Sequence, residues 1–157
     1  MNGITNQVIN KIEQATGLYH RLVLAVGPSG AGKTDALREV NRHLGAPLLN
    51  VNLEISRRML EMTVRQRAVQ VSRLLEEVLS ESDEEVVLLD NIEILFDPSL
   101  QQDPLKLLLN LSRNRTLVVS WNGQVRNKTL SYGDPGHPEY KRYAVENFLV
   151  ITPAAQS

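Results

Sequence analysis

The stretch from residue 27 to residue 34, GPSGAGKT, constrains the fold of this chain more than any other feature. It directly follows the apolar run 21–26 (RLVLAV) and precedes a predicted helix over about 33–43. A continuous apolar run of this length is typical of a strand buried on both faces of a parallel sheet. The pattern G-x-x-x-x-G-K-[ST] between such a strand and a helix predicts a loop that binds the phosphates of a nucleotide.

Each residue type in this loop has a chemical reason. Glycines allow backbone N–H groups to converge on phosphate oxygens, and the following helix points its positive dipole end at the same anion. Lys33 supplies a charge for the terminal phosphates, and the Thr34 hydroxyl is a predicted ligand of Mg²⁺. We expect ATP and Mg²⁺ as cofactors, ATP being preferred because the guanine-specificity motif N-K-x-D is absent from the sequence. The predicted nucleotide-binding residues are Gly27, Pro28, Ser29, Gly30, Ala31, Gly32, Lys33, Thr34 and Asp35.

Apolar patterning elsewhere predicts that strands and helices alternate along the chain. Further helices are expected over 4–16, 56–79 and 100–113, and further strands over 47–52, 86–90, 117–121 and 148–151. This alternation predicts an α/β fold with a five-stranded parallel sheet covered by helices on both sides, the three-layer architecture of phosphate-loop NTPases. No linker divides the chain, so we expect one domain over 1–157, made of an N-terminal helix (1–17), a nucleotide-binding core (18–152) and a short tail (153–157).

The composition excludes several kinds of site and partner. The chain has no cysteine, which rules out thiol nucleophiles, disulfides and thiolate zinc sites and suits a reducing cytosol. A formal net charge of −1 argues against a uniformly basic nucleic-acid binder, so any such contact requires a local patch. No apolar run approaches the roughly 18 residues of a membrane span, and the N-terminus does not have the features of a signal peptide. We therefore expect a soluble, cytoplasmic protein without a membrane partner.

An acidic residue ends the predicted strand 86–90 (VVLLD). A phosphate loop needs a carboxylate at the end of a neighbouring strand to hold the magnesium shell, and Asp90 is the predicted residue, with Thr34 as its partner. In many ATPases of this kind the next residue is a glutamate that polarises the attacking water, but here it is Asn91, which cannot accept a proton. Glu93 substitutes for it only if the turn brings its carboxylate back toward the γ-phosphate. The sequence thus supports nucleotide binding better than hydrolysis, and a slow ATPase is expected.

Polar residues also end the strand in TLVVSWNG, residues 116–123. Ser120 and Asn122 either contact the γ-phosphate or the water, or belong to an ordinary turn, because Asn-Gly is a strong turn signal. Residues 122–137 are polar, show little periodicity and are expected to lack regular structure, which is uncommon in a compact domain and often functional. His137 within them is interpreted as a turn or cap residue rather than as a catalytic base.

Arginines are candidates for two further roles. A finger from a neighbouring subunit often completes sites of this type, and the candidates are Arg113, Arg115 and Arg142. On the predicted helix 56–79, three more arginines share one side, away from the apolar stripe: Arg58, Arg65 and Arg73. This trio is either a solvated face, a subunit interface or a surface that contacts nucleic-acid phosphates.

In the order of its motifs, the chain resembles the AAA+ group of phosphate-loop ATPases. The pattern consists of GPSGAGKT, VVLLDNIE, the polar-tipped strand TLVVSWNG and the closing strand NFLVITP. More narrowly, it resembles BrxF, the family of small phosphate-loop proteins of type III bacteriophage-exclusion (BREX) defence systems, on the segments LDNIEILFD and SYGDPGHPEY. The resemblance implies an ATP-binding component of an anti-phage complex that acts with a larger ATPase, a methyltransferase and DNA. By position, Lys33, Thr34, Asp90, Glu93 and Asn122 take the family's site roles.

Two departures from ordinary AAA+ proteins bear on activity. The sequence given ends six residues after Ile151, without a helical lid domain, and Asn91 follows the acidic residue. Both make a homo-oligomer or a partner ATPase the expected completing factor, since ATP that bridges two subunits makes contacts that ADP cannot. Two other functions stay open: a small-molecule or nucleotide kinase, because the loop also fits G-x-x-G-x-G-K-[ST], and a nucleotide-regulated DNA-binding adaptor that uses the arginine trio.

Overall fold

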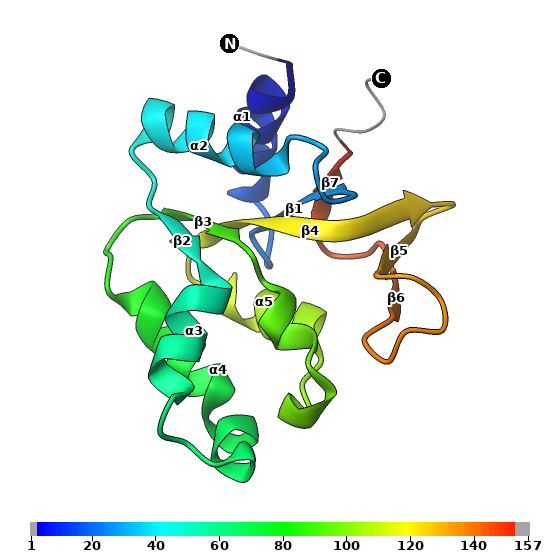
Figure 1. The fold of residues 1–157 in the computed structure, drawn as a ribbon. Helices are drawn as coiled ribbons and strands as arrows, with labels where there is room; N and C mark the ends of the chain where they lie inside the picture. The colour runs from blue at the N-terminus through cyan, green and yellow to red at the C-terminus, as the bar shows by residue number, and fades with distance from the viewer. Residues whose placement is uncertain (1–2, 153–157) are drawn as a thin grey trace.

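The computed structural model describes residues 3–152 and shows a parallel sheet between two layers of helices (Figure 1). Five strands run parallel in the order β2-β3-β4-β1-β7, and β5 and β6 continue from β4 in antiparallel pairing. The bounds are β1 Leu22–Gly27, β2 Leu48–Asn50, β3 Val86–Asp90, β4 Thr116–Arg126, β5 Thr129–Tyr132, β6 Lys141–Ala144 and β7 Leu149–Ile151. The predicted three-layer α/β phosphate-loop fold is confirmed. No helical lid follows β7 within residues 3–152, and the predicted tail 153–157 lies outside the described residues.

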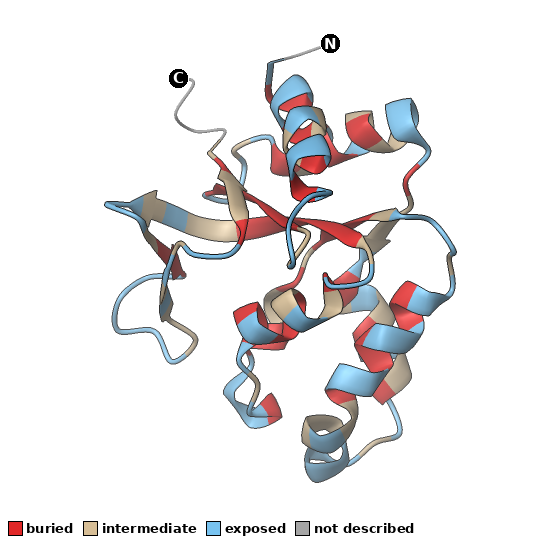
Figure 2. Cartoon of the chain, turned by 180° about the vertical axis from the view of Figure 1, so that it is seen from behind, coloured by how far each residue is buried: buried red, intermediate tan, exposed pale blue. Residues whose placement is uncertain are grey.

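Helices α1 (Gly3–Ala15) and α2 (Lys33–Leu44) cover one face of the sheet, whereas α3 (Val51–Met59), α4 (Val64–Ser80) and α5 (Pro104–Leu111) cover the other (Figure 1). Side chains of β1 alternate between the two layers: Leu24 packs on the α3–α5 side and Val23 on the α1–α2 side. Both faces of the central strands are therefore buried (Figure 2), which explains why β1 is a continuous apolar run.

The prediction of one long helix over 56–79 is wrong. The structure has two helices, α3 and α4, separated by residues 60–63. Thr63 caps α4 through a reciprocal capping box with Gln66, which satisfies N–H groups that a continuous helix would have used internally. Leu60 and Val64 continue the apolar spacing in the sequence but are 74% and 63% exposed.

The predicted helix over 100–113 is also shorter in the structure. A 3₁₀ turn, η2 (Pro98–Leu100), precedes α5, and a second, η1 (Glu93–Phe96), follows β3. Asp103 accepts a hydrogen bond from the N–H of Lys106 at 3.3 Å, and Pro104 occupies the first turn. A cap residue followed by proline is a strong helix start, which the apolar spacing alone did not reveal.

Residues 122–145, here called the ribbon, contain paired strands. The expectation that residues 122–137 lack regular structure is therefore wrong. Instead of turning at Asn122-Gly123, β4 continues to Arg126 and pairs with β5, which pairs with β6. The two-residue turn is Asn127-Lys128, with φ of 53° and 61°, as in the turns that match the twist of a hairpin. The ribbon projects from the body of the molecule beside β7 (Figures 1 and 2).

An aromatic cluster fixes the inner side of the ribbon to the body. Tyr132 stacks on Phe96 of η1 with ring centroids 3.4 Å apart and an interplanar angle of 5°. Trp121 meets Phe96 and Tyr143 edge-on, at centroid distances of 5.2 and 6.0 Å. The Tyr143 hydroxyl donates to Asp103 at 3.0 Å. Strands β4, β5 and β6 thus each contribute one aromatic ring to this cluster.

No helix in the described part of the chain is long and apolar enough to cross a membrane.

Candidate nucleotide-binding site

The loop between β1 and α2 has the conformation that phosphate binding requires. Gly30 and Gly32 both have φ of 87°, in the left-handed region that side chains with a Cβ rarely adopt. Lys33 is the first residue of α2, and its side chain turns back over the loop, where Nζ donates to the carbonyl oxygens of Gly27 at 2.8 Å and Pro28 at 2.6 Å. Two of the three ammonium hydrogens thus hold the charge at the mouth of the loop.

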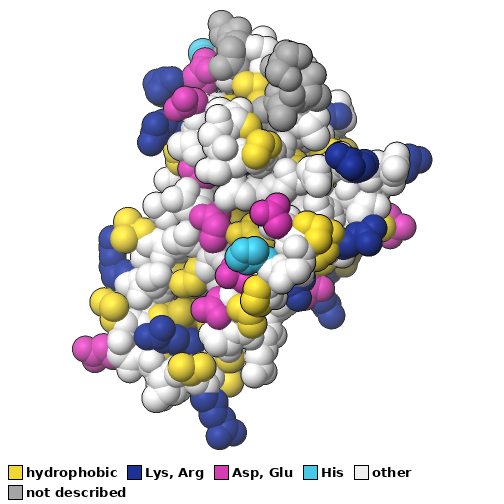
Figure 3. Space-filling model, turned by 45° about the vertical axis from the view of Figure 1, so that its right-hand side comes forward, with side chains coloured by type: hydrophobic (Ala, Val, Ile, Leu, Met, Phe, Trp, Pro, Cys, Tyr) yellow, Lys and Arg dark blue, Asp and Glu magenta, His cyan; other side chains and the backbone are white. Residues whose placement is uncertain are grey.

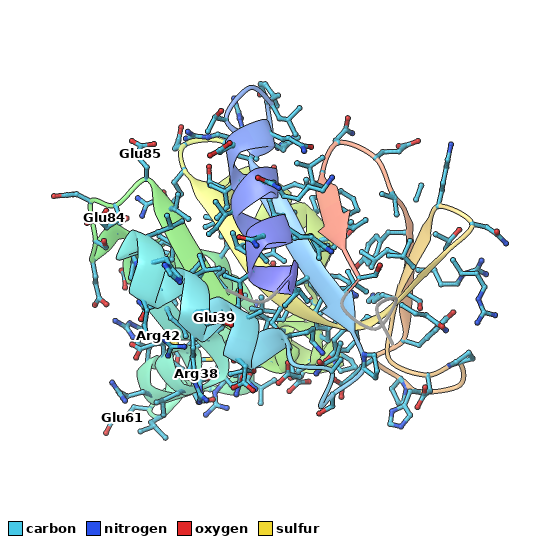
Figure 4. The ribbon with its side chains drawn as sticks, turned by 90° about the horizontal axis from the view of Figure 1, so that it is seen from above. Arg38, Glu39, Arg42, Glu61, Glu84 and Glu85 are labelled. Carbon is cyan, nitrogen blue, oxygen red and sulfur yellow. The ribbon has the colours of Figure 1, made fainter. Side chains whose placement is uncertain are left out.

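The phosphate loop and the acidic strand end meet directly. Asp90 is the last residue of β3, and the Thr34 hydroxyl donates to its Oδ2 at 2.8 Å. The carboxyl ends of parallel strands lie at one edge of the sheet, so this contact follows from the topology. Seen from above, Figure 4 shows Arg38, Glu39 and Arg42 along α2, the helix that follows the loop.

Asn91 shapes the turn that follows β3. Its φ is 53°, its N–H donates to Asp90 Oδ1 at 3.0 Å, and its carbonyl oxygen accepts from the N–H of Asn52 at 2.8 Å. This left-handed residue redirects the chain into η1, which starts at Glu93. The turn places Glu93 among the residues that line one cavity with Lys33 and Asp90.

Two amides hold the Glu93 carboxylate. Asn52 Nδ2 donates to Oε1 at 3.1 Å, and Asn122 Nδ2 donates to Oε2 at 3.5 Å. Burial raises the pKa of Glu93, the hydrogen bond from Asn52 lowers it, and the charge of nearby Asp90 raises it, with a net upward shift. A raised pKa moves a carboxylate toward the range in which it can act as a general base near neutral pH.

Burial also acts on the lysine. It lowers the pKa of Lys33, while the negative charges of Asp90 and Glu93 oppose the shift. Lys33, Asp90 and Glu93 line one cavity of about 380 Å³. Its remaining lining residues are Ser29, Gly30, Gly32, Thr34, Asp35, Arg38, Asn91, Ser120 and Asn122.

Two polar residues of the site were missed from the sequence, Asn52 and Arg38. Asn52 lies in α3, directly after β2, and its Oδ1 also accepts from the N–H of Ile94 at 2.7 Å. Arg38 lines the cavity from α2 and forms an exposed ion pair with Asp35 at 3.5 Å. The sequence signal for Asn52 is a polar residue that follows a short strand. This signal points to the site only once that strand, β2, is known to lie beside β3.

The predicted finger arginines lie outside the cavity of their own chain. Arg115 donates to the carbonyl oxygen of Leu79 at 2.6 Å, and Arg113 stacks over the Tyr19 ring at 4.7 Å. Both belong to the edge where the strands begin, near Glu84 and Glu85, which Figure 4 shows away from the phosphate loop. Arg142 is exposed on β6.

Arginines of α3 and α4 form ion pairs, and His137 lies in a turn. Arg58 pairs with Glu54 at 2.8 Å and Glu81 at 2.7 Å, and Arg73 pairs with Glu77. Carboxylates thus engage two of the three arginines considered for contact with nucleic acid. His137 lies in a turn, where its N–H donates to Asp134 and its carbonyl oxygen accepts from Tyr140.

The donor set fits Mg²⁺. The described residues include no cluster of three or more His, Cys, Asp or Glu side chains that could hold a metal ion alone. Mg²⁺ in nucleotide sites takes only one or two protein oxygen ligands and completes its shell with phosphates and waters. The Thr34 hydroxyl and the Asp90 carboxylate, 2.8 Å apart, supply such a pair.

Comparison with known proteins identifies the family of this chain. No curated protein matches the chain. Among solved structures, it is similar to C. elegans PCH-2, with a TM-score of 0.47 and 15% identity over 95% of this chain and 41% of that one. The chain therefore spans less than half the length of that protein. The model of the ATPase family associated with various cellular activities (AAA) matches residues 23–126, more than half of the chain. This chain belongs to the AAA family.

Proposed function

We propose that this protein binds ATP with Mg²⁺ and hydrolyses it slowly, with Glu93 in place of the glutamate that usually follows the acidic residue. The observation that carries the proposal is the 2.8 Å hydrogen bond between Thr34 and Asp90, which joins the phosphate loop to the end of β3. Glu93 lies in the same cavity. Membership of the AAA family supports water as the phosphoryl acceptor over the acceptor substrate of a kinase.

In the proposed reaction, the oxygen of a water molecule attacks the γ-phosphorus of ATP. The bond from that phosphorus to the β–γ bridging oxygen breaks, and ADP and inorganic phosphate are formed. The proton of the attacking water passes to a carboxylate oxygen of Glu93 and is then released to solvent.

The other residues position and neutralise the reacting groups. Asn52 and Asn122 fix the two oxygens of Glu93, so the base does not rotate away from the water. Lys33 balances charge on the terminal phosphates, which it can approach from the mouth of the loop. Mg²⁺, held by Thr34 and Asp90, would neutralise further charge on the β- and γ-phosphates.

Assembly belongs to the same proposal. Among the described residues the cavity contains only two cationic side chains, Lys33 and Arg38, and a neighbouring subunit would add an arginine to it. The candidates are Arg113, Arg115 and Arg142, and the exposure of Arg113 and Arg142 supports them. ATP would thus favour a homo-oligomer and ADP would release it.

We further propose that the protein acts in the cytoplasm, within an anti-phage complex of the BREX type. The support is the resemblance of segments 89–97 and 131–140 to the small phosphate-loop proteins of those systems. The proposed partners are a larger ATPase, a methyltransferase and DNA.

Release of γ-phosphate at saturating Mg-ATP tests the catalytic assignment. Glu93→Gln keeps the size of the side chain but removes the base, so we expect turnover to fall at least about 100-fold while ATP binding persists. Glu61→Gln, which changes an exposed glutamate beyond α3, is the matched control. Equal turnover in wild type and Glu93→Gln would remove Glu93 from the mechanism.

A further inference from the structure

The ribbon carries basic side chains that the rest of the chain does not neutralise. Its four cations are Arg126, Lys128, Lys141 and Arg142, and none forms an ion pair with another described residue. By contrast, five arginines elsewhere in the described chain form such pairs. Residues 122–145 contain four basic and two acidic side chains, a formal charge of +2 within a chain of −1. Figure 3 shows lysine and arginine side chains on its right-hand side, where the ribbon lies, and others along its left-hand side and lower end.

Strand register places polar groups together on one face of the ribbon. Ser131 pairs with Gln124 on one side and with Arg142 on the other, and paired residues share a face. Arg126 shares that face with Gln124, because alternate residues of a strand point the same way. The side chains border a hollow of about 410 Å³, together with Asn127, Thr129 and Tyr140.

The turn at the tip adds a further cation at a conformational cost. Lys128 has φ of 61°, a left-handed conformation that hairpin turns normally give to glycine. The result is an exposed lysine at the outer end of the ribbon, one residue beyond the turn's asparagine.

The chemistry of the hollow selects its ligand. Guanidinium, ammonium, amide and hydroxyl groups are the side-chain groups that contact phosphate oxygens in nucleic acids. Tyr140 is half-buried at the margin of the hollow and supplies a ring on which a base can stack, which requires a base that is free of its own partner. Binding of a duplex relies on many phosphate contacts, and the ribbon has few cations to make them. A single strand suits this surface better, because its unpaired bases can add stacking.

We propose that the exposed face of the ribbon binds single-stranded nucleic acid, with Arg126 and Lys128 on phosphates and a base stacked on Tyr140. This inference names a surface for the DNA partner, and it requires neither nucleotide binding nor hydrolysis. It also replaces the arginines of α3 and α4 as the contact surface, since Arg58 and Arg73 are paired with carboxylates.

The surface leads toward the nucleotide site along β4. Asn122, Gln124 and Arg126 alternate along that strand, so one strand face runs from the nucleotide cavity to the ribbon hollow. Another hollow, of about 430 Å³, lies between the nucleotide cavity and the ribbon hollow. It shares Ser29 and Asn122 with the nucleotide cavity and Gln124 with the ribbon hollow. A bound strand would therefore extend toward the phosphate loop.

Fluorescence anisotropy with a labelled oligo-dT of about 20 nucleotides tests the proposal in the absence of nucleotide and Mg²⁺. We expect Tyr140→Ala to weaken binding roughly 5-fold or more, because stacking of a base on an aromatic ring is worth about 1–3 kcal/mol. Arg126→Gln should reduce the slope of log K against log salt by about 0.7, the value for one phosphate contact on a single strand. Arg65→Gln, which removes an exposed arginine of α4, is the matched control and should leave both quantities unchanged.

Three outcomes would overturn the proposal. The first is no oligo-dT binding at low salt. The second is tighter binding of a duplex of equal length than of oligo-dT, with no effect of Tyr140→Ala. The third is equal competition by polyglutamate at matched charge, which would assign the surface to an acidic protein instead. Because the assay contains no ATP, a failed ATPase proposal would leave its result unaffected.

Discussion

In the proposed mechanism, activity depends on Glu93, and the environment of this residue predicts a pH dependence. Burial raises the pKa of the carboxyl group, whereas the hydrogen bond from Asn52 lowers it. Only the deprotonated form can accept a proton from water, so turnover should be lost as the pH falls through this raised pKa. The acid limb of the kcat profile is therefore expected above the ordinary pKa of glutamate, about 4.3.

Asn52→Ala provides a separate test of how Glu93 is held. It removes a donor that stabilises the charged carboxylate, so the pKa of Glu93 should rise further and the acid limb should move to higher pH. Turnover at neutral pH should fall as well, while a purely structural role would leave the profile in place. Asn114→Ala, at an exposed position remote from the cavity, is the control. An unshifted acid limb in Asn52→Ala would contradict the positioning role.

At the scale of single residues, the sequence predicted the site wherever the residues belong to a local motif. The phosphate loop and its helix are contiguous, and Asp90 ends a recognisable strand, so their placement could be predicted. Asn52 could not, because its two contacts with the Glu93 segment span 41 and 42 residues. Arg38 could not be predicted either, because its place in the cavity depends on how α2 lies beside it.

Elements were predicted well where their ends have strong local signals. Strand β3 matches the predicted 86–90, and α2 ends at Gly45, whose φ is 71°. The prediction of one long helix over 56–79 was wrong because the apolar spacing continues by chance across the helix cap at Thr63. The ribbon was missed because Asn122-Gly123 reads as a turn in isolation, whereas in the structure both residues continue β4.

Gly123 gives the ribbon a specific test. A Cβ at this position would lie 1.8 Å from the Ser131 carbonyl oxygen and 3.0 Å from Trp121 Nε1, which itself donates to that oxygen at 3.0 Å. Gly123→Ala must therefore displace β5, and we expect a loss of roughly 1–3 kcal/mol or more, as for overpacking. Thermal unfolding measures the loss, and fluorescence of the single tryptophan reports the local change.

Gly17→Ala is the matched control for that experiment. A Cβ there meets one atom, the Gln14 carbonyl oxygen, at an ordinary 4.0 Å, so its melting temperature should stay near that of the wild type. A Gly123→Ala protein with unchanged melting temperature and emission would show that β4 and β5 do not approach as described.

For the whole molecule, the parallel sheet brings the site together from four neighbouring strands, β2, β3, β4 and β1. Registers of β1 with β4 and of β2 with β3 align Gly27 with Asn122 and Asn50 with Asp90. This convergence could be predicted from the alternation of strands and helices, because carboxyl ends of parallel strands share one edge. The antiparallel ribbon could not, because its attachment depends on aromatic contacts between Phe96 and distant strands.

Assembly is the prediction that belongs to the molecule as a unit. Light scattering should show a larger particle with Mg²⁺ and a non-hydrolysable ATP analogue than with ADP, since in the proposed assembly only the triphosphate would reach an arginine across an interface. Lys33→Ala should remove the difference. The same mass in every nucleotide state would contradict nucleotide-gated assembly and leave the site as that of an isolated subunit.

Calorimetric titration of the wild-type protein and Lys33→Ala with Mg-ATP tests the central claim most directly. We predict one site per chain in the wild type and roughly 10- to 100-fold weaker binding in the variant, because a charged hydrogen bond is worth about 1.5–3 kcal/mol. Arg57→Ala, which removes an exposed cation of α3, should bind as the wild type does. Absence of Mg-ATP binding by the wild-type protein, or equal affinity in Lys33→Ala, would contradict the assignment of the phosphate loop.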